Sequence, residues 1–211
     1  MADEATTRWT PPAIPHGFLL YPGKEWGKAD SGVIRALDSK LRALSLSAYT
    51  TDFSGLAAFA PNRLWALSAE RMPVHDEQLA HLSDITSLTK LELNNTDITD
   101  AGLAHLIPLE DLAELLLFGT KITDHGLRLV GRFANLKNLN LGETAVTDEG
   151  LAHLSQLALL DALNLRGTQV RGPGLRNLHR LKELDWLALS MNIDRDAKKA
   201  LKAALPDLQI V

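Results

Sequence analysis

Histidines and aspartates recur at fixed intervals along this chain, and both residue types can carry chemistry. The histidines are His81, His105 and His153, and the aspartates are Asp100, Asp124 and Asp148. Imidazole and carboxylate groups are common metal ligands. The histidine position falls on the solvent side of the expected helices, and no carboxylate stands at ligand spacing beside it. The aspartates stand where short helices should begin, a place where a carboxylate caps backbone N–H groups. We therefore expect neither a metal site nor a catalytic carboxylate.

Other sequence signatures of catalysis are also missing. The chain contains no G-x-S-x-G, H-E-x-x-H, P-loop or dinucleotide-binding motif. It contains no cysteine, which excludes cysteine nucleophiles and thiolate metal sites. We expect a protein without enzymatic activity, cofactor or metal ion.

A repeat of 24 residues positions these side chains. Four threonines mark the same point in successive copies of one pattern: Thr96, Thr120, Thr144 and Thr168. The copies begin at Leu64, Leu88, Leu112, Leu136, Leu160 and Leu184, and the last runs to Val211. A fixed period in this range is typical of a solenoid, in which each repeat buries its apolar side against its neighbours.

Each copy predicts one short strand followed by one short helix. Leu91 and Leu93 alternate with polar residues and should point inward from a strand. In the turn that follows, the Thr hydroxyl should bond to neighbouring backbone, and we expect the four threonines to stack as a ladder. Leu103, Leu106 and Leu109 then share one face of a helix. Glycines that allow close packing within the coil recur at Gly102, Gly126, Gly150 and Gly174.

The repeat L-x-x-L-x-L-x-x-T-x-I/V-T-D-x-G-L resembles the leucine-rich repeat, with Thr in place of the Asn or Cys of that frame. Its T-x-I-T-D-x-G-L part is similar to a subtype found in many bacterial proteins and in the ribonuclease-inhibitor-like and cysteine-containing branches. The resemblance implies an α/β fold: a curved right-handed solenoid with parallel strands on the concave face and short helices on the convex face. It also implies protein binding, because the family includes receptors, ligase adaptors, inhibitors and host-directed effectors.

The chain before the repeats divides into two segments. Residues 1–29 are rich in Pro, Gly and aromatic residues and should form an irregular arm. This arm either packs on the first coils or docks into another protein as a linear peptide. Residues 30–63 should form a capping helix with its apolar face from Val33 to Leu44. A degenerate coil is also expected there, out of the 24-residue register by about one residue, with Leu41, Leu44, Leu46, Leu56 and Phe59.

Residues 64–211 contain the repeats and a C-terminal cap. In the last copy, Asp194 replaces the usual Ile or Val, and the register is lost. A final helix carrying Lys198, Lys199 and Lys202 should follow. The side chains expected to close the core are Leu201, Leu205, Leu208 and Ile210.

Composition and charge restrict the compartment and the partner. The start, Met-Ala-Asp-Glu, has neither the basic nor the apolar region of a secretion signal, so we expect a cytoplasmic protein. That the protein is bacterial is implied by the resemblance of its repeat. An export route independent of such a signal would leave no trace in the sequence. No apolar run is long enough to cross a membrane, and a net charge of −4 argues against nucleic acid as the main partner. The charge is uneven: from Arg166 to Lys202, nine basic residues outweigh four acidic ones.

The outward strand positions form the candidate site, because they should line the concave face. The residues proposed to bind a partner are Glu92, Glu114, Leu116, Phe118, Asn140, Asn164, Arg166 and Trp186. Leu116 and Phe118 should face solvent without serving the core, and Trp186 and Arg166 are of types enriched in interface hot spots. The N-terminal arm or a second copy of the chain could instead cover this patch.

These observations predict a non-catalytic interaction module that binds a protein partner on its concave face. We expect it to be a monomer or a weak homo-oligomer. Two alternatives stay open: a structural or regulatory subunit of a larger assembly, and an injected effector resembling a ubiquitin-ligase adaptor.

Overall fold

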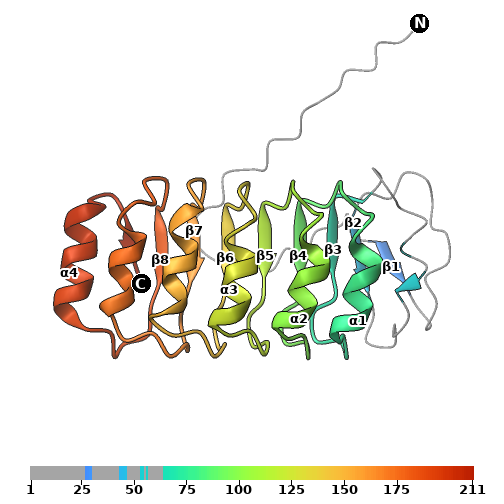
Figure 1. Cartoon of the computed structure of the whole chain (residues 1–211), viewed down its shortest axis with the longest axis horizontal. Coiled ribbons are helices and arrows are strands. Elements are labelled where there is room, and N and C mark those ends of the chain that lie inside the picture. The colour runs from blue at the N-terminus through green and yellow to red at the C-terminus, as the bar shows by residue number, and fades with distance from the viewer. Residues whose placement is uncertain (1–26, 30–42, 47–52, 55, 57–63) are drawn as a thin grey trace, which may run out of the picture.

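The fold is a single parallel sheet backed by one layer of short helices. The computed structural model describes residues 27–29, 43–46, 53, 54, 56 and 64–211. Within these residues nine strands pair in sequence order. Figure 1 labels β1 to β8 along the solenoid. The strands are β1 (Gly27–Ala29), β2 (Ala43–Leu46), β3 (Ala66–Ser68), β4 (Lys90–Glu92), β5 (Glu114–Leu116), β6 (Asn138–Asn140), β7 (Ala162–Asn164), β8 (Trp186–Ala188) and β9 (Gln209–Ile210).

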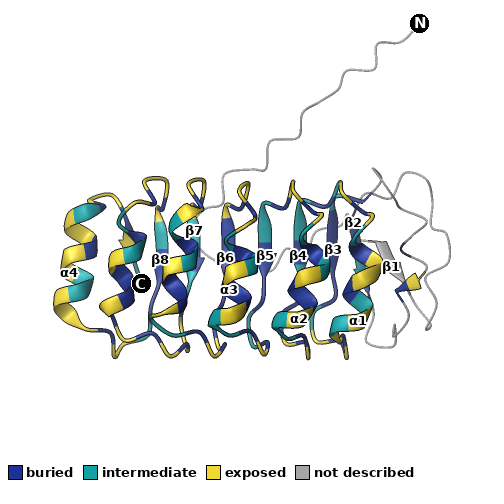
Figure 2. Cartoon of the chain, viewed as in Figure 1, coloured by how far each residue is buried: buried dark blue, intermediate teal, exposed yellow. Residues whose placement is uncertain are grey.

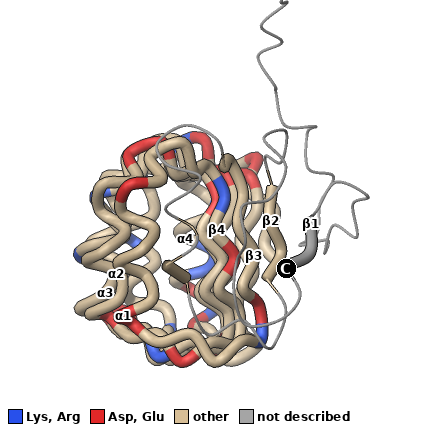
Figure 3. The backbone as a smooth tube through the Cα atoms, turned by 90° about the vertical axis from the view of Figure 1, so that its right-hand side faces the viewer, with Lys and Arg blue, Asp and Glu red and all other residues tan. Residues whose placement is uncertain are grey.

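Short α and 3-10 helices occupy the other half of each coil. They are α1 (Asp76–Leu79), η2 (Ala80–Leu82), α2 (Asp100–Leu103), η3 (Ala104–Leu106), α3 (Asp124–Val130), η4 (Gly150–Gln156), η5 (Pro173–Leu178) and α4 (Arg195–Ala204), with η for a 3-10 helix. Viewed along the solenoid in Figure 3, α1, α2 and α3 lie on the side opposite the strands. The predicted α/β solenoid is therefore confirmed.

Leucines fill the space between the two layers. Leu91, Leu115 and Leu139 pair in register on neighbouring strands, and all three are fully buried. Helix residues such as Leu103 and Leu106 are buried against them. Figure 2 shows this buried interior running the length of the repeats. Each coil thus closes its apolar side on the next coil, as the 24-residue period predicts.

The turn after each strand repeats one backbone conformation. The residue before the Thr position has a positive φ angle in five successive coils: Arg71, Asn95, Gly119, Glu143 and Gly167. The Thr that follows is buried, and its hydroxyl donates to the carbonyl three residues earlier. This bond is 2.7 Å from Thr96 to Leu93, and it recurs in the next three coils. The predicted role of the threonines in the turn is confirmed.

The prediction that the recurring aspartates cap helices is wrong. The N-cap residue of α2 is Thr99, whose hydroxyl accepts from the Ala101 N–H; Thr123 does the same for α3. Asp100 instead reaches the next coil: its Oδ1 accepts from the Thr123 N–H at 2.8 Å and its Oδ2 accepts from the Thr123 hydroxyl at 2.6 Å. Asp76 and Asp124 make the same pair of bonds to the coil that follows them.

The recurring glycines make room for this link between coils. A Cβ atom added to Gly126 would collide with Oδ1 of Asp100, and the same holds for Gly102 with Asp76 and Gly150 with Asp124. The T-D-x-G motif therefore works across two coils. Its Thr caps a helix, its Asp bonds the next coil, and its Gly admits the Asp of the preceding coil.

The N-terminal end differs in part from the prediction. Leu44 belongs to a strand, β2, which pairs with β3 as a coil out of the 24-residue register. Gly27–Ala29 form β1 and pair with β2, although residues 1–29 were expected to lack regular structure. Strand pairing in the tertiary structure provides hydrogen bonds that the local Pro and Gly content gave no reason to expect. The rest of the arm and most of the expected capping helix lie outside the described residues.

The C-terminal cap closes the end of the core as expected, but the buried position of the last coil is one residue earlier than in the other coils. Ile193 takes the buried place of the usual Ile or Val, and Asp194 is the N-cap of α4, accepting from the Ala197 N–H at 2.8 Å. Leu201, Leu205 and Leu208 are buried, and Ile210 packs partly buried against the core. In the described part of the chain, no helix is both long and apolar enough to cross a membrane.

Candidate functional site

The sheet face turned away from the helices carries all eight candidate residues; we call it the outer sheet face. Six of them lie on strands β4 to β8, and Phe118 and Arg166 follow the ends of β5 and β7. Two rows run across the strands in register. One contains Lys90, Glu114, Asn138, Ala162 and Trp186, and the other contains Glu92, Leu116, Asn140, Asn164 and Ala188. The expected alternation of inward and outward residues is confirmed.

An ion pair and a half-buried carboxyl lie toward the N-terminal end of this face. Nζ of Lys90 is 3.0 Å from Oε2 of Glu114, and both side chains are largely buried, at 14% and 20% exposed. Burial raises the pKa of the neighbouring Glu92 carboxyl above its ordinary value of 4.5, against the opposing effects of a hydrogen bond from Ser68 and the charge of Lys90. Lys90 was missing from the candidate list, although its register beside two glutamates was visible in the repeat.

Glu92→Gln is expected to raise the melting temperature at pH 7. Because the folded-state pKa of Glu92 is raised, its charged form destabilises the folded protein, and this effect disappears as pH falls through that pKa toward 4.5. The gain from Glu92→Gln should therefore shrink in the same pH window. Thermal unfolding from pH 7 to pH 4 measures it. Glu110→Gln, at an exposed position, is the control and should show no such trend; a parallel trend in both variants would contradict the assignment to Glu92.

The asparagines of this face hold the backbone of the turns. Oδ1 of Asn140 accepts from the Gly142 N–H at 3.0 Å, and Oδ1 of Asn164 accepts from the Arg166 N–H at 2.9 Å. In each side chain the Oδ1 atom is therefore engaged with the turn backbone. Asn140 and Asn164 thus stabilise the turns, and they stay candidate contacts for a partner. Asn138 differs, because its Oδ1 is buried without a hydrogen-bond partner. Asn138 was an outward position in the sequence pattern, but it was not among the selected site residues.

The expectation that Leu116 faces solvent is wrong. Leu116 points outward from β5 but is only 7% exposed. Register places Glu92 on one side of it and Asn140 on the other. Strand alternation gives the direction of a side chain, but the exposure of that side chain depends on the size of its cross-strand neighbours. Leu116 thus packs between its cross-strand neighbours and helps to keep the outer sheet face in shape.

Phe118 and Arg166 flank Gly142 in the turns beyond β5, β6 and β7. A Cβ atom on Gly142 would lie 2.8 Å from Cδ2 of Phe118 and 3.1 Å from Nδ2 of Asn164, so the Phe118 ring leans over the Gly142 backbone. Phe118 is half-buried, and Arg166 on the other side of Gly142 is exposed. Trp186, at the C-terminal end of the face, is also half-buried.

The repeated histidines do not form a metal centre in the described structure. His81 is exposed on η2, and His105 and His153 are half-buried on η3 and η4. No group of three or more His, Cys, Asp or Glu side chains that could hold a metal ion occurs in the described ranges.

Solved structures of two bacterial proteins resemble this solenoid. An internalin (inlF) from Listeria monocytogenes has a TM-score of 0.67 at 26% identity, over 82% of this chain and 47% of its own. The internalin C2 (inlC2) of the same organism has a TM-score of 0.62 at 22% identity, over 82% of this chain and 72% of its own. Internalins are leucine-rich repeat proteins. This chain has a leucine-rich repeat fold.

The leucine-rich repeat assignment rests on structure and on the repeat pattern. No known family profile and no curated protein sequence matches the chain. The chain spans about half the length of the inlF structure, at 47%. The likeness to internalins supports a protein-interaction module in general terms. The T-x-I-T-D-x-G-L subtype stays a prediction, because neither comparison tests it.

Proposed function

We propose that this leucine-rich repeat protein is a non-catalytic module that binds a protein partner on its outer sheet face, the face that the repeat pattern predicts to be concave. The observation that carries the proposal is the Phe118–Gly142–Arg166 row. There an aromatic ring lies over a glycine that adds no side chain, and the next residue of the row, Arg166, is exposed. Aromatic residues and Arg are enriched among the residues that dominate interface energetics.

The face supplies contacts of two kinds. Phe118, in the turn after β5, and Trp186, at the C-terminal end of the face, provide aromatic area, and Arg166 can pair with a carboxylate of the partner in a bidentate manner. Glu92 and Glu114, toward the N-terminal end of the face, provide acceptors. Six coils at about 4.8 Å spacing give a ribbon on the order of 25 Å long, enough for an extended peptide or one helix.

The candidate residues have different parts in this proposal. The direct contacts are Glu92, Glu114, Phe118, Arg166 and Trp186. Leu116, Asn140 and Asn164 support them, because Leu116 is buried and the two asparagines bond the turn backbone. Their substitution should affect binding through the shape of the face.

Single substitutions test the proposal once a partner is isolated from native extract. Phe118→Ala and Trp186→Ala should each weaken binding by about 2 kcal/mol or more, because each removes an aromatic anchor. Arg166→Ala should weaken binding and also reduce its dependence on salt. Isothermal titration calorimetry at two salt concentrations measures both effects.

Arg128→Ala is the matched control, because Arg128 is an exposed cation on α3, on the opposite side of the molecule. It should bind as the unsubstituted protein does. Loss of binding in Arg128→Ala, with normal binding in the three variants of the sheet face, would show that the partner binds the helical side of the solenoid and would contradict the proposal. Equal melting temperatures for all four variants are required to exclude unfolding as the cause.

A further inference from the structure

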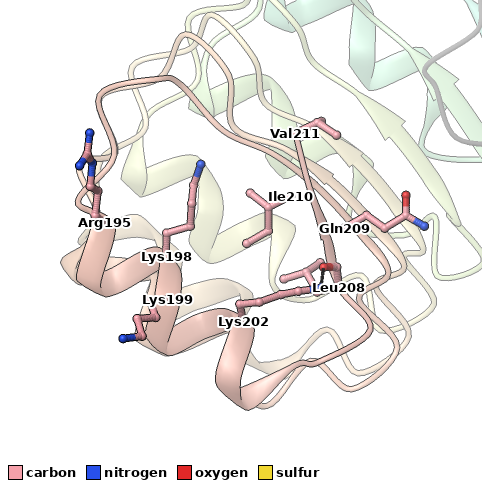
Figure 4. A pocket seen from close by; sticks show the side chains of 8 residues that line it. All are labelled: Arg195, Lys198, Lys199, Lys202, Leu208, Gln209, Ile210 and Val211. Carbon is pink, nitrogen blue, oxygen red and sulfur yellow. Dashed lines mark hydrogen bonds between the residues drawn. The ribbon is translucent and has the colours of Figure 1, made fainter.

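The C-terminal end of the solenoid contains a second surface, separate from the outer sheet face. An open hollow of about 670 Å³ lies between α4 and β9. Figure 4 shows it from close by, with α4 on one side and the terminal strand on the other. Leu208 and Ile210 provide its apolar part. Ile210 pairs with the inward-facing Leu187, so its side chain points toward the helix layer and into this hollow.

Basic residues form the other side of the hollow. Arg195, Lys198, Lys199 and Lys202 have the i, i+3, i+4, i+7 spacing of a single helix face, and all four line the hollow. Within the described residues none of them forms an ion pair. Lys202 is engaged otherwise, since its Nζ donates to the carbonyl of Pro206 at 2.7 Å and to that of Leu208. Arg195, Lys198 and Lys199 therefore leave positive charge at the rim without an acidic counterpart.

The edge of the sheet adds backbone groups to this surface. β9 is the last strand of the described sheet. Gln209 and Val211 direct their backbone toward β8: their N–H groups donate to the carbonyls of Asp185 and Leu187 at 2.7 and 3.0 Å. Backbone groups of successive strand residues point to opposite sides, so the N–H and C=O of Ile210 face away from β8. An unpaired strand edge of this kind can pair with another strand.

We propose that this hollow, which we call the terminal groove, binds an extended acidic peptide segment of a partner protein. The segment adds an antiparallel strand to β9, in which the N–H and C=O of Ile210 bond to the C=O and N–H of the peptide residue opposite Ile210. Its side chain opposite Ile210 is apolar and packs against the partly buried Ile210. The side chains two residues before and after point to the same side and are acidic, so that they meet Lys198 and Arg195. Charge complementarity selects this occupant, and the apolar floor with its free backbone groups favours a peptide over nucleic acid or an anionic lipid surface.

A designed peptide tests the proposal with the full chain. The probe is a fluorescein-labelled seven-residue peptide with Glu, Val and Glu at its second, fourth and sixth positions and Thr elsewhere. Its binding is measured by fluorescence anisotropy. Three altered peptides remove one element each: Lys in place of both Glu, Ser in place of Val, and an N-methyl group on the Val nitrogen. Each should bind at least about tenfold more weakly than the probe.

Protein variants locate the site. Arg195→Glu combined with Lys198→Glu should weaken binding of the probe by about tenfold or more. Acidic residues in the first turns of α4 favour the helix, so this variant should stay folded. Arg128→Glu on α3 is the control and should bind the probe normally. Lys202 is left unchanged because it bonds the backbone.

Several results would overturn the proposal. They are absence of binding, equal binding of the N-methylated peptide, and equal binding by the Arg195→Glu, Lys198→Glu protein. Competition by a phosphate-rich single-stranded oligonucleotide or by vesicles of anionic lipid, at concentrations below those of the unlabelled peptide, would show that the groove recognises charge alone and would also reject the proposal. The outer sheet face is unaltered in these experiments, so their failure leaves the proposed function untouched.

Discussion

Leu139→Ala should lower the free energy of unfolding by about 2–5 kcal/mol, because a large-to-small substitution in a close-packed core removes burial and leaves a cavity. Leu139 is fully buried on β6, in register between Leu115 and Leu163 of the neighbouring coils. A coil in the middle of the solenoid is packed on both sides and has little freedom to collapse into the space. Urea unfolding followed by circular dichroism measures the change.

Lys137→Ala is the matched control for this substitution. Lys137 is exposed and directly precedes β6, and the bond from its backbone N–H to the Ala113 carbonyl survives the change. Its effect should stay within about 0.5 kcal/mol, as for most surface substitutions. Equal destabilisation by the two variants would show that Leu139 is not a core position of the solenoid.

Asp100→Ala should lower the free energy of unfolding by about 3 kcal/mol, since it removes two hydrogen bonds to a carboxylate and leaves the Thr123 N–H without its acceptor. A carboxylate that only favoured the N-terminus of α2 would contribute about 0.3–1 kcal/mol. The size of the effect therefore separates the link between coils from a local effect on the helix. Thermal and urea unfolding measure it.

Two further variants complete this test. Asp100→Asn keeps one acceptor oxygen for the Thr123 N–H and should lose less stability than Asp100→Ala. Asp111→Ala removes an exposed carboxylate and should change stability by less than about 0.5 kcal/mol. If Asp100→Ala and Asp111→Ala proved equally stable, the bonds between coils would contribute nothing to folding.

The candidate site shows where prediction from the sequence stops. Strand alternation correctly placed Phe118, Arg166 and Trp186 on the face away from the helices, because successive strand residues must point to opposite sides. It could not give the exposure of Leu116, which depends on the side chains beside it on β4 and β6. It also gave no sign that Phe118 leans over Gly142, a contact between residues 24 positions apart that exists only once the coils stack.

The same limit explains the aspartates. Within one repeat, Asp100 stands at the start of a helix, so a local interpretation assigns it to that helix. Its hydrogen bonds go to Thr123 of the next coil, and the glycine that admits it, Gly126, is also in the next coil. The repeat pattern showed that Asp and Gly recur together, but the partner of each could be found only in the stacked structure.

The sequence by itself determined the repeat length, the identity of the buried leucines and the α/β solenoid, because these follow from a period that every copy repeats. Only the tertiary structure decided which contacts join neighbouring coils and which elements close the two ends of the solenoid. It added β1 and β9 through pairing with β2 and β8, and it moved the buried position of the last coil from 194 to Ile193. The physical reason is that a strand at the end of a sheet is defined by hydrogen bonds to its neighbour, and two or three residues without a repeat carry no local signal of that neighbour.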